Sequence, residues 1–381
     1  MTLENLLNNE DERILRFPIA KEKIFLSHAA VTALPQCAAE AMAQYAHSSS
    51  LDHQEFPEFI ETMNRTRSLA ANLIGAKASE IALLGPTSLG LSLFANGIDW
   101  RTGDEVLCYQ DDYPANVYPW VELQRKGVKT KFLEPEEPGA ITPELVESSI
   151  GPETRLVALA SCHYLTGYRI DIDAIGKMLK DRGILFALDG IQTCGAFPTP
   201  VENVDFMSCD AHKWLLGPCA AGVFYVRRDL QDRLAPQAFG WNNVRCPDYI
   251  AQEQMTLRTD ARRYEAGSFN ILGIAGFNAA LGLLLEVGIE TIASDLAAKR
   301  AWLVDAIRAK GFEVIFPESE SVGGITSCCR EGKDLKALGE KLATENIIAS
   351  VRADRSGRDY LRFSPHFYNT TDEFERAVAL L

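Results

Sequence analysis

The chain has 381 residues, of which 47% are hydrophobic and 24% are charged, and its formal net charge at pH 7 is −14. This composition excludes a disordered or fibrous protein, and an acidic chain without a basic run argues against a nucleic-acid partner and favours a small-molecule substrate. No apolar stretch approaches the ~20 residues that span a bilayer, and the N-terminus is unlike a signal peptide, so we expect a cytoplasmic protein without membrane contact.

Cysteine and histidine spacings give no sign of a metal site. The nine cysteines are scattered, and neither they nor the six histidines form a C-x-x-C or H-x-x-x-H pattern. We therefore expect reduced thiols and no bound metal.

Between about residues 70 and 230, helical patterns alternate with short apolar runs, which is typical of βαβ units around a parallel sheet. The runs are mostly apolar, as strands buried on both faces are, and predict strands at 81–84, 105–108, 156–160, 185–188 and 222–226. Among the helices, one is predicted over 172–182, because Asp171 is a suitable N-cap and Gly183 a suitable C-cap.

A long Ala/Leu/Gly-rich helical pattern begins near Ile271, and strands and helices resume around 312–315 and 334–343. We therefore predict a large domain over residues 21–275 and a smaller C-terminal domain over 276–381. The first segment, 1–20, is expected to pack on the small domain or on a partner subunit.

Two polar residues follow apolar runs in the middle of the chain. Asp189 closes the predicted strand 185–188, and Lys213 lies in the segment 208–218, Ser-Cys-Asp-Ala-His-Lys-Trp-Leu-Leu-Gly-Pro. Pyridoxal 5′-phosphate (PLP) needs both groups, a lysine amine for its aldehyde and a carboxylate that keeps its pyridine nitrogen protonated. Taken singly, a helix N-cap for Asp189 and a surface position for Lys213 are the better interpretations.

Together with their context, these segments resemble class V aminotransferases, a fold-type I PLP-dependent family that also contains cysteine desulfurases, kynureninase and isopenicillin N epimerase. The resemblance implies an α/β fold with a mostly parallel central sheet flanked by helices, plus a smaller C-terminal α+β domain. It makes Asp189 the pyridine partner and places Gln192 near the phenolic oxygen. In the same way, Lys213 becomes the Schiff-base lysine and His212 a phosphate or active-site ligand.

A phosphate cradle is expected at 85–90, Gly-Pro-Thr-Ser-Leu-Gly, because this segment follows a strand and opens a helical run. Helix N-termini bind anions, so Thr87 and Ser88 would offer amides and hydroxyls, although such residues are ordinarily caps. Ser208 is a further phosphate candidate from the resemblance. Its role is weakened because Asp210 occupies the position where the family often has serine or threonine.

The segment 112–120, Asp-Tyr-Pro-Ala-Asn-Val-Tyr-Pro-Trp, resembles the family's E-H-H-A-N-x-x-P-W stretch, whose first histidine stacks on the pyridine ring. Tyr113 would take that stacking role as a catalytic and cofactor-binding residue. A phenol ring covers the cofactor as imidazole does, but it is not the same acid or base near neutral pH. A core position for Tyr113 is the alternative.

Two later segments also match the family. Segment 263–270 resembles F-E-A-G-T-P-N, which would bring Ser268 to the neighbouring subunit's phosphate and implies a symmetric homodimer with the active site at its interface. Segment 362–370 resembles R-x-S-x-x-x-Y-N-T, which makes Arg362 the ligand of the substrate carboxylate, a role suited to a guanidinium fork. A surface arginine is the alternative.

Two further residues are candidates for substrate contact. His28 falls where the family has a small-residue loop near the substrate, and a capping or core histidine is an equally good interpretation. Tyr164, with His163, follows the predicted strand 156–160 and is placed to line the site.

The reaction follows from what the residues provide. With an amino acid bound as an external aldimine, Lys213 would move the α-proton, and transamination of a small amino acid is the first interpretation. Related desulfurases carry a cysteine nucleophile before the carboxylate arginine, whereas residues 350–360 contain none. The alternatives are a PLP-dependent lyase, by C–S cleavage or a related β-elimination, or an epimerase; a non-catalytic PLP-fold binding protein is disfavoured by Asp189 with Lys213.

Overall fold

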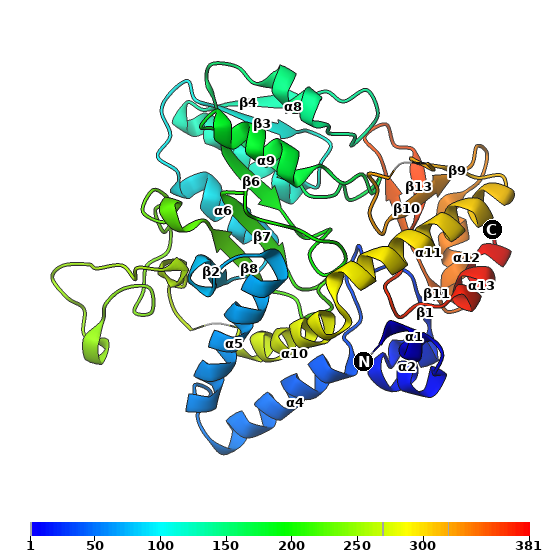
Figure 1. The fold of residues 1–381 in the computed structure, drawn as a ribbon, viewed down its shortest axis with the longest axis horizontal. Helices are drawn as coiled ribbons and strands as arrows, with labels where there is room; N and C mark the ends of the chain where they lie inside the picture. The colour runs from blue at the N-terminus through cyan, green and yellow to red at the C-terminus, as the bar shows by residue number, and fades with distance from the viewer. Residues whose placement is uncertain (1, 269, 319) are drawn as a thin grey trace.

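A seven-stranded sheet forms the centre of the molecule in the computed structural model, which describes residues 2–268, 270–318 and 320–381 (Figure 1). Its order is β2-β8-β7-β6-β5-β3-β4. The strands are β2 (Ile81–Leu83), β3 (Glu105–Tyr109), β4 (Lys129–Leu133), β5 (Thr154–Ala160), β6 (Leu185–Asp189), β7 (Phe206–Asp210) and β8 (Gly222–Val226). Only β8 pairs antiparallel with its neighbours. The predicted α/β class with a mostly parallel sheet is therefore confirmed.

Two strands were missing from the sequence prediction. In β4, Lys129 and Lys131 alternate with partly buried residues on an exposed edge, so the strand lacks the apolar run of its neighbours. β7 is fully buried but contains Ser208, Cys209 and Asp210, which interrupt the apolar pattern.

Successive strand residues face two separate hydrophobic layers. Leu107 and Val157 belong to the layer that contains α5 (Pro57–Ile74), α9 (Ile172–Asp181) and α10 (Ile271–Val287), whereas Val106 and Leu156 face α6 (Thr87–Gly97). Both faces of the sheet are therefore buried, which explains the apolar strand sequences. Helix α9 matches the helix predicted from the sequence, and the Asp171 side chain caps it by accepting from the Ala174 amide.

A second, antiparallel sheet of order β12-β13-β10-β9 lies in the C-terminal part of the chain (Figure 1). Its strands are β9 (Glu313–Val314), β10 (Thr326–Cys329), β12 (Ser350–Ala353) and β13 (Asp359–Phe363). The neighbouring helices are α11 (Ile289–Ala309), α12 (Leu335–Thr344) and α13 (Thr371–Ala379). The predicted boundary near residue 275 stays a prediction, and it falls inside α10.

The N-terminal helices contact the C-terminal part of the chain. They are α1 (Leu3–Leu7), α2 (Glu10–Arg16) and α3 (Ile19–Glu22). Arg13 pairs with Glu373 at 2.8 Å, and the Phe17 ring stacks on Tyr368 with centroids 4.0 Å apart. Next, β1 (Ile24–Phe25) pairs in parallel with β11 (Ile347–Ile348), so the start of the chain is fixed beside the small sheet.

The remaining α-helices pack beside elements already described. They are α4 (Gln36–Leu51), α7 (Tyr118–Val121) and α8 (Pro143–Ser149). Helix α4 contacts α10, α7 contacts α6 and α8 contacts α9. Within the described residues, no single helix is long and apolar enough to cross a membrane; α10 and α11 together meet that test by length and composition only, and they are bent by 76°.

Candidate active site

A cavity of about 240 Å³ lies at the carboxyl ends of β6 and β7, between the large sheet and the β12–β13 hairpin. Most of the residues predicted from the sequence line it: Thr87, Ser88, Tyr113, Tyr164, Asp189, Gln192, His212, Lys213 and Arg362. Ligands bind at this edge of parallel sheets, where strand ends and helix starts converge. The cavity is therefore the candidate active site.

Lys213 follows β7 and points into the cavity although its side chain is almost buried, with 7% exposure. Its Nζ lies 5.2 Å from the centroid of the Tyr113 ring. Burial lowers the pKa of Lys213 to about 8, and the charge of Asp189 opposes this shift. About a tenth of this amine is therefore uncharged, and nucleophilic, at pH 7, far more than for an exposed lysine.

Asp189 ends β6, where it is 2% exposed, and its Oδ1 accepts a 3.0 Å hydrogen bond from the Ile191 amide. Burial raises the pKa of this carboxyl to about 7. A cationic partner in the cavity would stabilise its ionised form.

Helix α6 starts at the cavity wall. Its N-cap residue Pro86 supplies no side-chain cap, so the first amides of the helix are available to an anion. The Thr87 hydroxyl accepts from the Asp210 amide at 2.9 Å, which ties the helix start to the end of β7. Gly90 permits this approach, because a Cβ there would lie 2.2 Å from the Ser208 Oγ.

Beside this helix start, the His212 Nδ1 hydrogen-bonds to the Asp210 carboxylate. Asp210 Oδ2 also accepts from the Ala220 amide at 3.1 Å, so the carboxylate holds both the imidazole ring and the following loop. Gln192 is fixed at both ends, because its Oε1 accepts from Trp214 Nε1 and its Nε2 donates to the Ala29 carbonyl.

Aromatic rings form the wall opposite the sheet. The Tyr113 ring is 48% exposed and makes an edge contact with Tyr164, with centroids 5.5 Å apart. Sequence reasoning missed Asp112, which is buried behind Tyr113 and accepts from the Asn116 side chain at 3.0 Å. Burial raises the pKa of Asp112 to about 6. Its only sequence signal was the turn-like Asp-Tyr-Pro-Ala-Asn pattern.

Two arginines reach the cavity from the small sheet. Arg362 on β13 is 1% exposed, its guanidinium donates to the Tyr164 carbonyl, and its Nε has no hydrogen-bond partner among the described residues. Burial lowers the pKa of Arg362 to about 9. Arg352 on β12, which the sequence analysis did not identify, lines the same cavity.

The turn that follows Arg352 is tied to the large sheet. Arg355 forms an ion pair with Asp111 and donates to the Gln110 carbonyl at 2.9 Å. Asp111 lies shortly after β3 and next to Asp112, so this contact joins the hairpin to the wall that carries Tyr113.

His163 does not line this cavity, because its buried ring lies between the Thr166 hydroxyl and the Asp111 carbonyl. Three other predicted residues are also absent from the lining. His28 is fully buried, with its ring between the Ser364 carbonyl and the Tyr368 hydroxyl, and its neighbours Ala29 and Ala30 line the cavity instead. Ser208 is also buried and donates to the Thr87 carbonyl at 3.2 Å, so in this chain it supports the helix start from behind.

The third, Ser268, is exposed and donates to Glu55 at 2.9 Å. Its neighbour Phe269, part of the motif that singled it out, lies outside the described residues. Contact between Ser268 and a second subunit's phosphate site stays a prediction.

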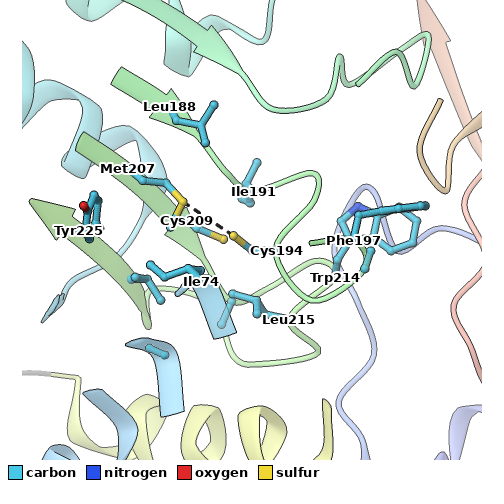
Figure 2. Close-up of a cluster of buried hydrophobic side chains, with 14 of the residues drawn as sticks. Ile74, Leu188, Ile191, Cys194, Phe197, Met207, Cys209, Trp214, Leu215 and Tyr225 are labelled. Atoms are coloured by element: carbon cyan, nitrogen blue, oxygen red, sulfur yellow. Dashed lines mark hydrogen bonds between the residues drawn. The ribbon is translucent and has the colours of Figure 1, made fainter. Parts of the chain in front are cut away.

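A layer of buried hydrophobic side chains lies next to the ends of β6 and β7. Figure 2 shows Met207 and Cys209 of β7 packing near Leu188 of β6 and against Cys194, and the Cys194 and Met207 sulfur atoms are 3.9 Å apart. These side chains are 1% exposed or less. The loops that carry Asp189 and Lys213 therefore rest on a closely packed base, which holds their positions.

Comparisons with known proteins agree on one family. The family model described as Aminotransferase class-V matches residues 24–376. A probable cysteine desulfurase of Methanothermobacter thermautotrophicus is 27% identical over 282 residues, which cover 72% of this chain and 70% of the relative. The uncharacterized aminotransferase YcbU of Bacillus subtilis is 27% identical over 365 residues, 95% of this chain and 94% of the relative.

The fold is also found among solved structures. The complex between the cystine C–S lyase C-DES and its reaction product cysteine persulfide matches with a TM-score of 0.87 and 20% sequence identity. The match covers 95% of this chain and 98% of the other, so the whole architecture is shared.

Proposed function

Because the chain belongs to the aminotransferase class-V family, we propose that it cleaves the C–S bond of a cysteine-derived amino acid by β-elimination. The protein is a PLP-dependent enzyme of this family, as its sequence resemblance implied. The choice of reaction is our proposal.

The residues of the cavity fit PLP. The open amides of α6 with Thr87, Ser88 and His212 would hold the phosphate, and the buried carboxylate of Asp189 would face the ring nitrogen. Lys213 would bind the aldehyde carbon. When bound, the cofactor supplies an electron sink for the α-carbon of an amino acid.

The protein's own groups then carry the elimination. Arg362 binds the α-carboxylate, which orients the amino acid in the cavity. With its amine free, Lys213 would take the α-proton of the bound amino acid. The thiolate departs from the β-carbon and takes up a proton, and hydrolysis of the remaining fragment gives pyruvate and ammonia. The Asp189 carboxylate would stay ionised opposite a protonated ring nitrogen, because that positive charge offsets the cost of its burial.

One observation carries the proposal. The wall formed by β12 and β13 presents two guanidinium groups, and among the described residues no cysteine lines the cavity. A protein thiol in position to accept sulfur is what a desulfurase of this family requires, so here the sulfur would leave with a small molecule. The Methanothermobacter relative is named a probable cysteine desulfurase, which supports cleavage of a C–S bond. The C-DES structure contains cysteine persulfide as the reaction product, so in that protein the sulfur leaves on a small molecule.

Transamination is the second candidate. The Bacillus subtilis relative that covers 95% of this chain is named an aminotransferase, and the same lysine could return the proton to the cofactor. The comparisons nevertheless favour the lyase alternative over the aminotransferase interpretation that the sequence analysis placed first.

Product analysis separates these reactions. PLP-loaded protein is incubated with L-cystine, L-cysteine, S-methyl-L-cysteine and L-alanine, and pyruvate, ammonia, alanine, sulfide, persulfide and pyridoxamine phosphate are quantified. We expect pyruvate and ammonia in equal amounts, with a thiol or persulfide. Alanine formed with released sulfur would identify a desulfurase, and pyridoxamine phosphate formed with an oxo acid would identify an aminotransferase; either result would overturn the proposal.

We also propose a homodimer with the active site at its interface. Leu89, Tyr113 and Tyr118 are large hydrophobic residues that are exposed in the monomer, and Ser268, which donates to Glu55 within this chain, is exposed as well. Sedimentation analysis that finds a monomer at micromolar concentration would contradict this. The cytoplasmic location stays a prediction.

A further inference from the structure

Arg352 and Arg362 lie on one face of an antiparallel strand pair. Ser350 on β12 is directly opposite Arg362 on β13, and Arg352 follows Ser350 by two residues. Side chains two residues apart on a strand point to the same side, so the two arginines are diagonal neighbours, at a separation of roughly 7–8 Å. Both line the cavity that contains Lys213.

Neither arginine is neutralised by the protein. Among the described residues, the guanidinium of Arg352 donates to the Val351 carbonyl and that of Arg362 to the Tyr164 carbonyl, and neither has a carboxylate partner. The neighbouring turn behaves differently, because Arg355 pairs with Asp111 and Arg358 with Glu313. Among the described residues, the two arginines that line the cavity therefore lack the carboxylate partners that the arginines of the outer turn have.

The cavity is consequently rich in positive charge. Burial is the main reason that the pKa of Arg362 falls to about 9, and the charge of Arg352 lowers it further. Arg352 also contributes to the lowered pKa of Lys213. Asp189 would face the cofactor ring, and the amides at the start of α6 would hold the phosphate. One substrate carboxylate would satisfy Arg362 and leave Arg352 without a counter-ion.

We propose that Arg352 forms a second anion subsite, which binds a carboxylate at the far end of the substrate side chain. The inference rests on the proposed C–S lyase function, since it places the scissile sulfur between two carboxylates. Because both guanidinium groups reach the same cavity, Arg362 could hold the α-carboxylate while Arg352 holds a carboxylate at the other end of the same substrate. The substrate class is therefore a cysteine disulfide or thioether with a terminal carboxylate, such as L-cystine.

A substrate pair tests the subsite in turnover. L-Cystine carries the distal carboxylate, whereas S-ethylthio-L-cysteine has the same disulfide without it. The wild-type holoenzyme should prefer L-cystine in kcat/KM, and Arg352→Gln should reduce that preference roughly 10- to 100-fold, the effect of one charge-assisted contact. Arg352→Lys, which keeps the charge, should restore part of it. Arg358→Gln removes an exposed arginine from the same hairpin and should change nothing.

A binding measurement without turnover separates the two proposals. Adipate and hexanoate have six carbons each, but only adipate has two carboxylates. Calorimetry on the holoenzyme should show tighter binding of adipate, and Arg352→Gln should abolish the difference. Equal binding, or a preference that survives in Arg352→Gln, would overturn the subsite. If no sulfur amino acid is turned over but the Arg352-dependent adipate preference is present, the C–S lyase proposal fails and the subsite stands.

Discussion

The two ends of the active-site cavity are built in different ways. The cofactor end (Thr87, Ser88, Asp189, His212 and Lys213) is formed by strand ends and a helix start of the large sheet. The substrate end (Tyr164, Arg352 and Arg362) combines a loop after β5 with a hairpin of the small sheet. The reactive groups thus rest on a closely packed scaffold, while substrate recognition depends on a separate sheet that can change its side chains without disturbing that scaffold.

The two ends also differ in charge balance. At the cofactor end, each basic group has a carboxylate nearby: the Lys213 amine is attracted by Asp189, and the His212 ring hydrogen-bonds to the Asp210 carboxylate. At the substrate end, Arg352 and Arg362 have no carboxylate partner among the described residues. Substitutions at the cofactor end should therefore reduce turnover of every substrate alike, whereas those at the substrate end should change affinity and choice of substrate.

Loss of Lys213 should have the largest effect. Lys213→Ala removes both the covalent anchor and the base for the α-proton, so kcat should fall roughly 100- to 10,000-fold or more for all substrates. Pyruvate release measures this, and borohydride should fix the cofactor on the wild-type chain but not on the variant. A variant that keeps a tenth of wild-type activity would place the base elsewhere.

Arg362→Gln addresses the other end. Without the guanidinium, the α-carboxylate loses a charge-assisted contact, so KM should rise roughly 10- to 100-fold for every amino acid tested. The cofactor should bind as in the wild type, which its absorbance spectrum reports. If PLP affinity fell as steeply as substrate affinity, the division of the cavity into two ends would be wrong. Arg358→Gln is the matched control on the same hairpin.

The cofactor end was predictable because its signals are local in the sequence. Asp189 closes an apolar strand, Lys213 lies in a compact motif, and Thr87 with Ser88 follows another strand, so a short window around each shows both element and chemistry. The parallel sheet then brings these windows to one edge without further information.

The substrate end was only partly predictable. Arg362 belongs to a recognisable motif, but Arg352 stands in the segment 350–360 with two other arginines. Only the register of β12 against β13 shows that Arg352 faces the cavity. His28 was also misplaced, because its ring is buried between the Ser364 carbonyl and the Tyr368 hydroxyl and does not line the cavity. Neither register nor enclosure by distant residues can be read from a local pattern.

The pH dependence of cofactor capture connects the two ends. The ammonium form of Lys213 cannot attack the aldehyde, and its pKa is about 8, so capture of PLP by the apoprotein should rise about tenfold per pH unit below pH 8 and level off above it. Removing the positive charge of Arg352 favours the ammonium form, so Arg352→Gln should shift the profile to higher pH. Stopped-flow absorbance measures both, and an unshifted profile would mean that the two ends are electrostatically independent.

The smallest effect is expected at the contact that holds the ends together. Arg355→Ala removes the ion pair with Asp111 and the hydrogen bond to the Gln110 carbonyl. These two contacts join the β12–β13 hairpin to the segment that carries Tyr113. Exposed pairs contribute about 0.2–1 kcal/mol, so KM should rise only a few-fold, with Tm almost unchanged.

Salt provides the internal check on that contact. Because a surface ion pair is screened, the difference between Arg355→Ala and the wild type should shrink between 0.05 and 0.5 M salt, with Debye lengths from above to well below about 10 Å. Arg358 lies on the same turn as Arg355 but pairs with Glu313 of β9, away from the cofactor end. Arg358→Ala should therefore leave KM unchanged at every salt concentration. A salt-independent loss in Arg355→Ala would instead assign the tie to the shape of the turn rather than to its charge.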